Sequence, residues 1–160
     1  MSTSKPNSVP LAYLLPLRLF VGLSFMIAGQ DKISMGGWGK AYATKLYDFA
    51  SVNLENAYSV YRPFLESFVM PNASTFSVLV AWSELFVGLS IFIGLFTRLG
   101  AAFGIFLILN YMFAAGRAIW LPGVDALYLW ALFTLMLCSA GRGWGADQIL
   151  RSRKKIKLFT

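Results

Sequence analysis

The sequence predicts an all-α integral membrane protein: a bundle of four transmembrane helices, with short amphipathic interfacial helices between the first and second. Hydrophobic residues fill 58% of the 160 positions and charged residues only 13%, and the mean hydropathy is +0.63. A soluble domain of this length exposes too much surface to cover with so few polar residues. The apolar runs also lack the strict alternation of barrel strands, so helices must satisfy their backbone groups in lipid.

The four predicted spans form a single domain that covers residues 1–160. Each span is a run of roughly 20 mostly apolar residues, long enough to cross about 30 Å of hydrocarbon, and each is bounded by charged or turn residues. The spans cover residues 10–31, 73–96, 99–118 and 122–141.

Residues 32–72, between the first two spans, form the only large polar segment. Two pieces of it carry apolar residues at helical spacing, which predicts short amphipathic helices at the outer interface. These helices either cover the outer end of the bundle or act as a lid over a pocket that opens outward. The spaced residues are Trp38, Tyr42, Leu46 and Phe49, then Tyr58, Tyr61, Leu65 and Phe68.

The net charge of +7 comes mainly from a basic tail at residues 142–160. Because this tail follows an apolar run, it indicates contact with the lipid bilayer and not with nucleic acid. Basic residues favour the cytoplasmic side of a membrane, so we expect both termini to be cytoplasmic. The residues that this orientation places inside are Lys5, Arg98, Arg142, Arg151, Arg153, Lys154, Lys155 and Lys157.

The chain has no histidine and one cysteine, Cys138. This composition excludes b-type haem, iron–sulfur clusters, zinc sites, Ser-His-Asp catalysis and an intramolecular disulfide. We expect no haem, metal or flavin, so any chemistry must use Arg, Lys, Asp, Glu, Tyr or Trp, or a borrowed cofactor.

Two charges, Arg18 and Glu84, fall inside predicted spans, where an unpaired ion costs about 2.5 kcal/mol or more. Counting residues at 1.5 Å each puts Asn110 at nearly the depth of Glu84, within reach of an extended Arg18. We therefore predict a polar cluster of these three residues, flanked by the aromatic residues Trp82, Phe86 and Tyr111. The cluster is either a structural ion pair that fixes helix register or a site for a quinone.

A second polar layer is predicted at the outer end of the bundle. It contains Asp31, Lys32, Arg117 and Asp125, which lie at the ends of three different spans. The layer is either a plain interfacial network or a mouth in which Lys32 and Arg117 attract an anion. Glycines at positions 22 and 29, and a GxxxG step at positions 100 and 104, predict close helix packing.

Three segments resemble the DoxX family of membrane proteins. LRLFVGLSFMIAGQDK, with Arg18, Gly22, Gly29 and Lys32, is similar to the opening of that family. ELFVGLSIFIGLFTRLG is similar to its second signature, through Glu84, Gly88, Gly94, Thr97, Arg98 and Gly100. GRGWGAD, residues 141–147, is similar to its closing segment.

The resemblance implies a multi-pass protein of the bacterial cytoplasmic membrane. The family includes the membrane subunit of thiosulfate:quinone oxidoreductase, which works with a second polypeptide. The expected function is a quinone-interacting subunit of an oxidoreductase complex, with a homo-oligomer left open. Its catalytic residues would be Glu84 and Arg18, and its binding residues Asn110, Trp82, Tyr111, Lys32, Arg117 and Asp125.

Because no redox centre is built into the chain, the alternative is a non-catalytic accessory or assembly subunit of a larger membrane complex. In that role the buried charges only fix helix register, and the aromatic outer segment docks a partner.

Overall fold

The computed structural model describes residues 11–120, 122–142 and 145–147, and every regular element in these ranges is helical. The principal helices are α1 (Leu15–Ser34), α2 (Ala43–Asn53), α3 (Arg62–Phe64), α4 (Ala73–Ile93), α5 (Thr97–Ala114) and α6 (Val124–Cys138). Shorter turns are η1 (Leu11–Leu14), η2 (Gly37–Tyr42), η3 (Leu65–Val69) and η4 (Ala140–Arg142).

The four long helices follow the four predicted runs, with shifted ends. α1 begins five residues later than predicted, because Pro16 in its first turn has the backbone angle of a helix start. α5 ends at Ala114, just before Gly116 adopts a left-handed conformation with φ of 64°. The basic tail lies outside the described residues, except for residues 142 and 145–147.

Two helices of the described chain, α4 and α5, are long and apolar enough to cross a membrane. α6 is apolar but has only 15 residues, and α1 carries Arg18, Asp31 and Lys32. Membrane spanning by all four helices therefore stays a prediction, as does the interfacial position of the short helices between α1 and α4.

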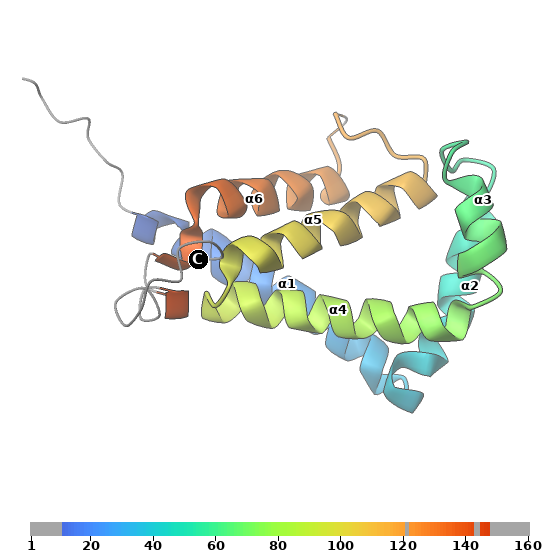
Figure 1. Cartoon of the computed structure of the whole chain (residues 1–160), viewed down its shortest axis with the longest axis horizontal. Helices are drawn as coiled ribbons and strands as arrows, with labels where there is room; N and C mark the ends of the chain where they lie inside the picture. The colour runs from blue at the N-terminus through green and yellow to red at the C-terminus, as the bar shows by residue number, and fades with distance from the viewer. Residues whose placement is uncertain (1–10, 121, 143–144, 148–160) are drawn as a thin grey trace, which may run out of the picture.

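The helices pack in the order α1, α4, α5, α6 (Figure 1). The ring of Tyr128 on α6 stacks on Phe20 at 6.4 Å and meets Phe25 edge-on at 6.0 Å, so α6 also contacts α1. The described ends of the chain lie at one end of the bundle, and α2 and α3 cover the other end (Figure 1). We call the end covered by α2 and α3 the outer end.

Two apolar clusters hold the fold together. The larger one fills the centre of the bundle between the four long helices, with Val21, Val87, Ile91, Met112, Leu132 and Leu135 among its most buried members. The smaller one joins the short helices to the outer end, through Leu46, Ala50, Ala57, Leu65, Val69 and Ala114. The short helices are thus packed onto the bundle as a cap.

Candidate functional site

Glu84 on α4, a buried acid between the long helices, is held by side chains from two other helices. Its side chain is 5% exposed and forms an ion pair with Lys32 of α1. Its other carboxylate oxygen accepts a hydrogen bond of 2.7 Å from the hydroxyl of Tyr111 on α5. The Lys32 ammonium also lies 5.2 Å from the ring centre of Tyr42. Glu84 is therefore paired and hydrogen-bonded, as a buried charge must be.

Glycines bring Lys32 within reach of Glu84. A Cβ on Gly29 of α1 would lie 2.6 Å from the backbone nitrogen of Leu85, and one on Gly88 would lie 2.5 Å from that of Met26. α1 and α4 can approach this closely only because both positions lack a side chain, which confirms the predicted packing role of Gly29. One turn beyond Gly29, the Lys32 side chain runs back along α1, where its Nζ donates to the Ala28 carbonyl at 3.4 Å.

The predicted cluster of Arg18, Glu84 and Asn110 is wrong. Arg18 is 2% exposed, but its Nη1 donates to the Ala140 carbonyl at 3.1 Å, at the end of the bundle opposite α2. It lies against Gly94, which follows Glu84 by ten residues, or about 15 Å of helix. Because α1 begins at Leu15, Arg18 lies in its first turn and is too shallow to reach Glu84.

The electrostatic partner of Arg18 is Asp147, to which the sequence assigned no contact. Asp147 is 1% exposed, and its carboxylate accepts hydrogen bonds from the backbone N–H groups of Phe96 at 2.7 Å and Thr97 at 3.0 Å. It thereby satisfies two free donors at the start of α5. Arg18 and Asp147 thus stabilise the end of the bundle opposite α2 and α3, and their role is structural.

Asn110 belongs to a different polar contact. Its side-chain oxygen accepts a hydrogen bond of 2.5 Å from the hydroxyl of Tyr61, and its amide nitrogen donates to the Phe106 carbonyl at 2.6 Å. The adjacent residue, Tyr111, is the one that reaches Glu84. Trp82 points elsewhere: its ring stacks on Trp38 at 6.0 Å, and its indole N–H donates to the Trp38 carbonyl at 3.2 Å.

The predicted outer layer is assembled around a cavity of about 330 Å³, which we call the polar cavity. Two ion pairs line this cavity, Arg117–Asp125 and Lys32–Glu84. Asp31 is exposed and takes no part in the lining. The remaining lining residues are Ser24, Phe25, Ala28, Tyr42, Phe49, Ile108, Tyr111, Val124 and Tyr128.

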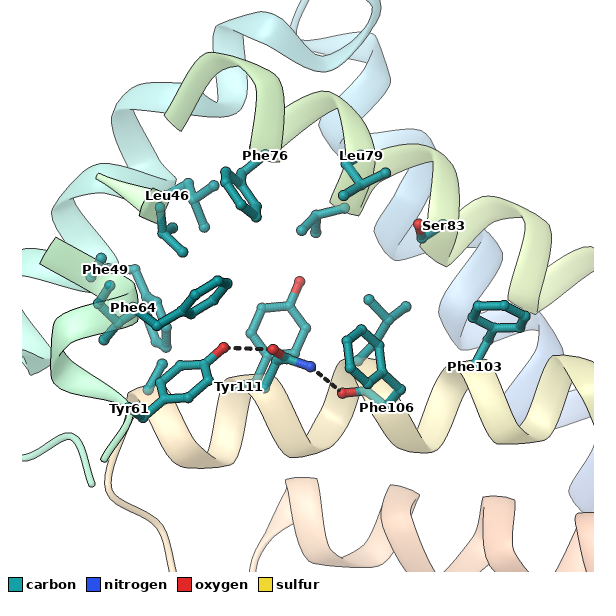
Figure 2. Close-up of a pocket in the computed structure, with 17 residues that line it drawn as sticks. Leu46, Phe49, Tyr61, Phe64, Phe76, Leu79, Ser83, Phe103, Phe106 and Tyr111 are labelled. Carbon is teal, nitrogen blue, oxygen red and sulfur yellow. Dashed lines mark hydrogen bonds between the residues drawn. The ribbon is translucent and has the colours of Figure 1, made fainter. Parts of the chain in front are cut away.

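A second cavity, of about 300 Å³, lies between α2, α4 and α5 (Figure 2). We call it the apolar cavity, because aliphatic and aromatic side chains form most of its wall. Its polar groups are the Tyr61–Asn110 contact, Ser83 and Tyr111. The apolar lining residues include Leu46, Phe49, Phe64, Phe76, Leu79, Phe103 and Phe106.

The apolar cavity exists because α4 and α5 diverge towards the outer end (Figure 1). Near their hairpin they are close, since a Cβ on Gly104 would lie 3.1 Å from Val87 and from Leu132. Farther out, this interface has bulkier residues in place of glycine. The short helices fill the gap between α4 and α5 only in part. Phe49 and Tyr111 line both cavities, and their rings meet edge-on at 6.3 Å. These two rings separate the cavities.

The surroundings of the two cavities raise the pKa values of two tyrosines in the outer segment. Burial raises the pKa of Tyr61 to about 12. Burial, and then the negative charge of Glu84, also raise the pKa of Tyr42. Both hydroxyls are therefore neutral at physiological pH and can donate hydrogen bonds. Within the described ranges, no group of three His, Cys, Asp or Glu side chains is placed to hold a metal ion.

Residues 13–117 match the family model named DoxX. The chain belongs to the DoxX family. No curated protein and no solved structure matches the chain. The DoxX match covers α1 to α5, including Lys32, Glu84 and Tyr111, and stops before α6. DoxX proteins are a membrane family, which agrees with the apolar α4 and α5 helices.

The cavity residues that the sequence did not assign to a site include Tyr42, Phe49 and Tyr61. It placed all three on short outer helices but assigned no contact to them. Their signal was the aromatic spacing of residues 38–49 and 58–68, which predicted a cover for the outer end. The same cover supplies the polar partner of Asn110 and the ring packed against Tyr111.

Proposed function

We propose that this DoxX-family chain is the quinone-binding membrane subunit of an oxidoreductase complex, and that the quinone ring binds in the apolar cavity. The observation that carries the proposal is a mostly apolar cavity of about 300 Å³ with few polar groups on its wall. Ligand sites have this size and character, with a small number of polar groups that orient the ligand.

The polar groups of the apolar cavity suit a quinone carbonyl. The side-chain amide of Asn110 has two N–H donors, and the Phe106 carbonyl accepts one of them. The second is available to a carbonyl oxygen of the ligand. Phe49, Phe64 and Phe106 offer flat faces for the ring. Arg18, which lies at the far end of the bundle, has no role in this site.

In this proposal the electrons for quinone reduction come from a separate donor. We propose a second polypeptide that oxidises an inorganic sulfur compound, with thiosulfate as the candidate donor. The loss of two electrons joins two thiosulfate ions into tetrathionate. The same two electrons, with two protons, convert a quinone into a quinol.

We also propose that α1 and α6 span the bacterial cytoplasmic membrane with α4 and α5, and that both termini are cytoplasmic. Large apolar side chains project outward from α1 and α6, as on helices that face lipid. They include Phe20, Leu23 and Ile27 on α1, and Leu127, Trp130 and Leu137 on α6. Reporter fusions at Ser51 and Thr160 should report opposite sides of the membrane, and results from the same side would contradict this topology.

The functional proposal is tested by quinone binding to the purified protein in mild detergent. We expect endogenous quinone in the lipid extract, and saturable binding of decylubiquinone. Asn110→Leu should weaken binding by about tenfold, the equivalent of one hydrogen bond of roughly 1–1.5 kcal/mol. Asn72→Leu, at an exposed position of the outer segment, is the control. A folded protein that binds no quinone and copurifies with a larger complex would instead support the accessory-subunit alternative.

A further inference from the structure

The contact between Glu84 and Tyr111 lies on the boundary between the two cavities. Glu84 lines the polar cavity, whereas Tyr111 lines both. Figure 2 shows the hydroxyl of Tyr111 pointing towards α4 across the apolar cavity. That hydroxyl donates to Glu84 at 2.7 Å. One hydrogen bond therefore connects a polar, open cavity to an apolar one.

We infer that Glu84 and Tyr111 carry protons from the polar cavity to the ligand that is reduced in the apolar cavity. This inference rests on the proposed function, since it needs a quinone that accepts two electrons and two protons. In each transfer, Glu84 takes a proton from water in the polar cavity and passes it to the Tyr111 oxygen. The original hydroxyl proton of Tyr111 goes to a quinone oxygen. Two transfers, with two electrons from the sulfur donor, complete the quinol and leave both side chains unchanged.

The charges around Glu84 couple proton uptake to reduction. The groups that face it are Lys32 from α1, Tyr42 from η2 and Tyr111 from α5. Farther along the same cavity lie Arg117, Asp125 and, from α6, Tyr128. While all four groups are ionised, the positive charges of Lys32 and Arg117 balance the negative charges of two carboxylates, those of Glu84 and Asp125. A proton added to Glu84 leaves an excess positive charge, which an electron arriving beside Tyr111 offsets.

The position of the polar cavity gives this path a direction. Arg117 on its wall is 58% exposed, so water reaches the cavity from the outer end. At the opposite end, Arg18, Asp147 and Ala140 are buried, and Arg18 donates to the Ala140 carbonyl. The protons that complete the quinol are therefore drawn from the outer side of the membrane.

The test uses the full chain in lipid nanodiscs loaded with decylubiquinone. A ruthenium photosensitiser with a sacrificial donor supplies electrons on a flash, and a pH-indicator dye records proton uptake. Uptake that follows quinone reduction should slow by about a hundredfold or more in Tyr111→Phe, the usual effect of removing a proton-transfer group. Tyr47→Phe changes an exposed tyrosine of α2 that lines neither cavity, so this control should behave like the parent protein.

A second variant protects the test against misfolding. Glu84→Gln alone leaves the Lys32 charge unpaired, so the double variant Lys32→Met, Glu84→Gln removes both charges. It should bind decylubiquinone and show the same slow uptake as Tyr111→Phe. Quinone reduced on the flash, with uptake as fast as in the parent in both variants, would overturn the relay while leaving the proposed function intact. No bound quinone in the parent protein would overturn both.

Discussion

The Lys32–Glu84 pair should dominate the stability of the bundle. In Lys32→Met, a carboxylate whose side chain is only 5% exposed loses its cation and keeps only the Tyr111 hydroxyl. Breaking a buried pair in this way costs about 3–5 kcal/mol in the free energy of unfolding. The double variant Lys32→Met, Glu84→Gln should recover most of that loss, because no buried charge remains. Unfolding by SDS in mixed micelles, followed by circular dichroism, measures both.

Two comparisons make this prediction specific. Arg117→Gln breaks an ion pair whose arginine is 58% exposed, and should cost at most about 1 kcal/mol. Arg18→Leu and Glu84→Leu should add within about 0.5 kcal/mol, because the two residues lie at different levels of the bundle. A cost of Lys32→Met no larger than that of Arg117→Gln, or rescue of Arg18→Leu by Glu84→Leu, would contradict this assignment of partners.

Three further predictions follow from the packing, the chain ends and the outer segment. Gly29→Ala should destabilise the bundle by about 1–3 kcal/mol in the same SDS assay, because the new Cβ would lie 2.6 Å from the Leu85 nitrogen; Gly123→Ala, where nothing lies within 4 Å, should not. Asp147→Asn should cost about 1–3 kcal/mol and speed hydrogen exchange at the Phe96 and Thr97 amides, and unchanged exchange would contradict its capping role. The folded pKa of Tyr61, about 12, exceeds its ordinary value of 10.0, so Tyr61 contributes stability that is present below pH 10 and lost as pH rises through about 12. Tyr61→Phe should remove this alkaline loss and one tyrosinate transition in an absorbance titration.

The helices and their close packing were predictable from the sequence because both depend on local patterns. Long apolar runs bounded by charged or turn residues fix where helices form. A missing side chain at Gly29 permits close approach whatever the neighbouring helix. The positions of the four long helices and the close packing at Gly29 were therefore predicted correctly, with errors of a few residues at the helix ends, whereas the partner helix at Gly29 was not predicted.

The partners of the buried charges were not predictable in the same way. Counting depth from assumed span ends placed Arg18 near Glu84, but the α-helix α1 begins only at Leu15. The same count left Lys32 at the outer surface, because it ignored that a lysine side chain can run back along its helix. Contact between Tyr61 and Asn110 joins residues 49 positions apart, through a cap whose path the pattern does not fix.

Photolabelling tests the central claim, that the apolar cavity holds the quinone ring, most directly. An azidoquinone is bound to the purified protein, activated by light, and mapped by mass spectrometry of the labelled peptides. Our account predicts labels on α5 around Phe106 and Asn110 and on α2 around Phe49, with competition by decylubiquinone. Labels confined to the hairpin between α4 and α5, or labelling that decylubiquinone does not reduce, would contradict it.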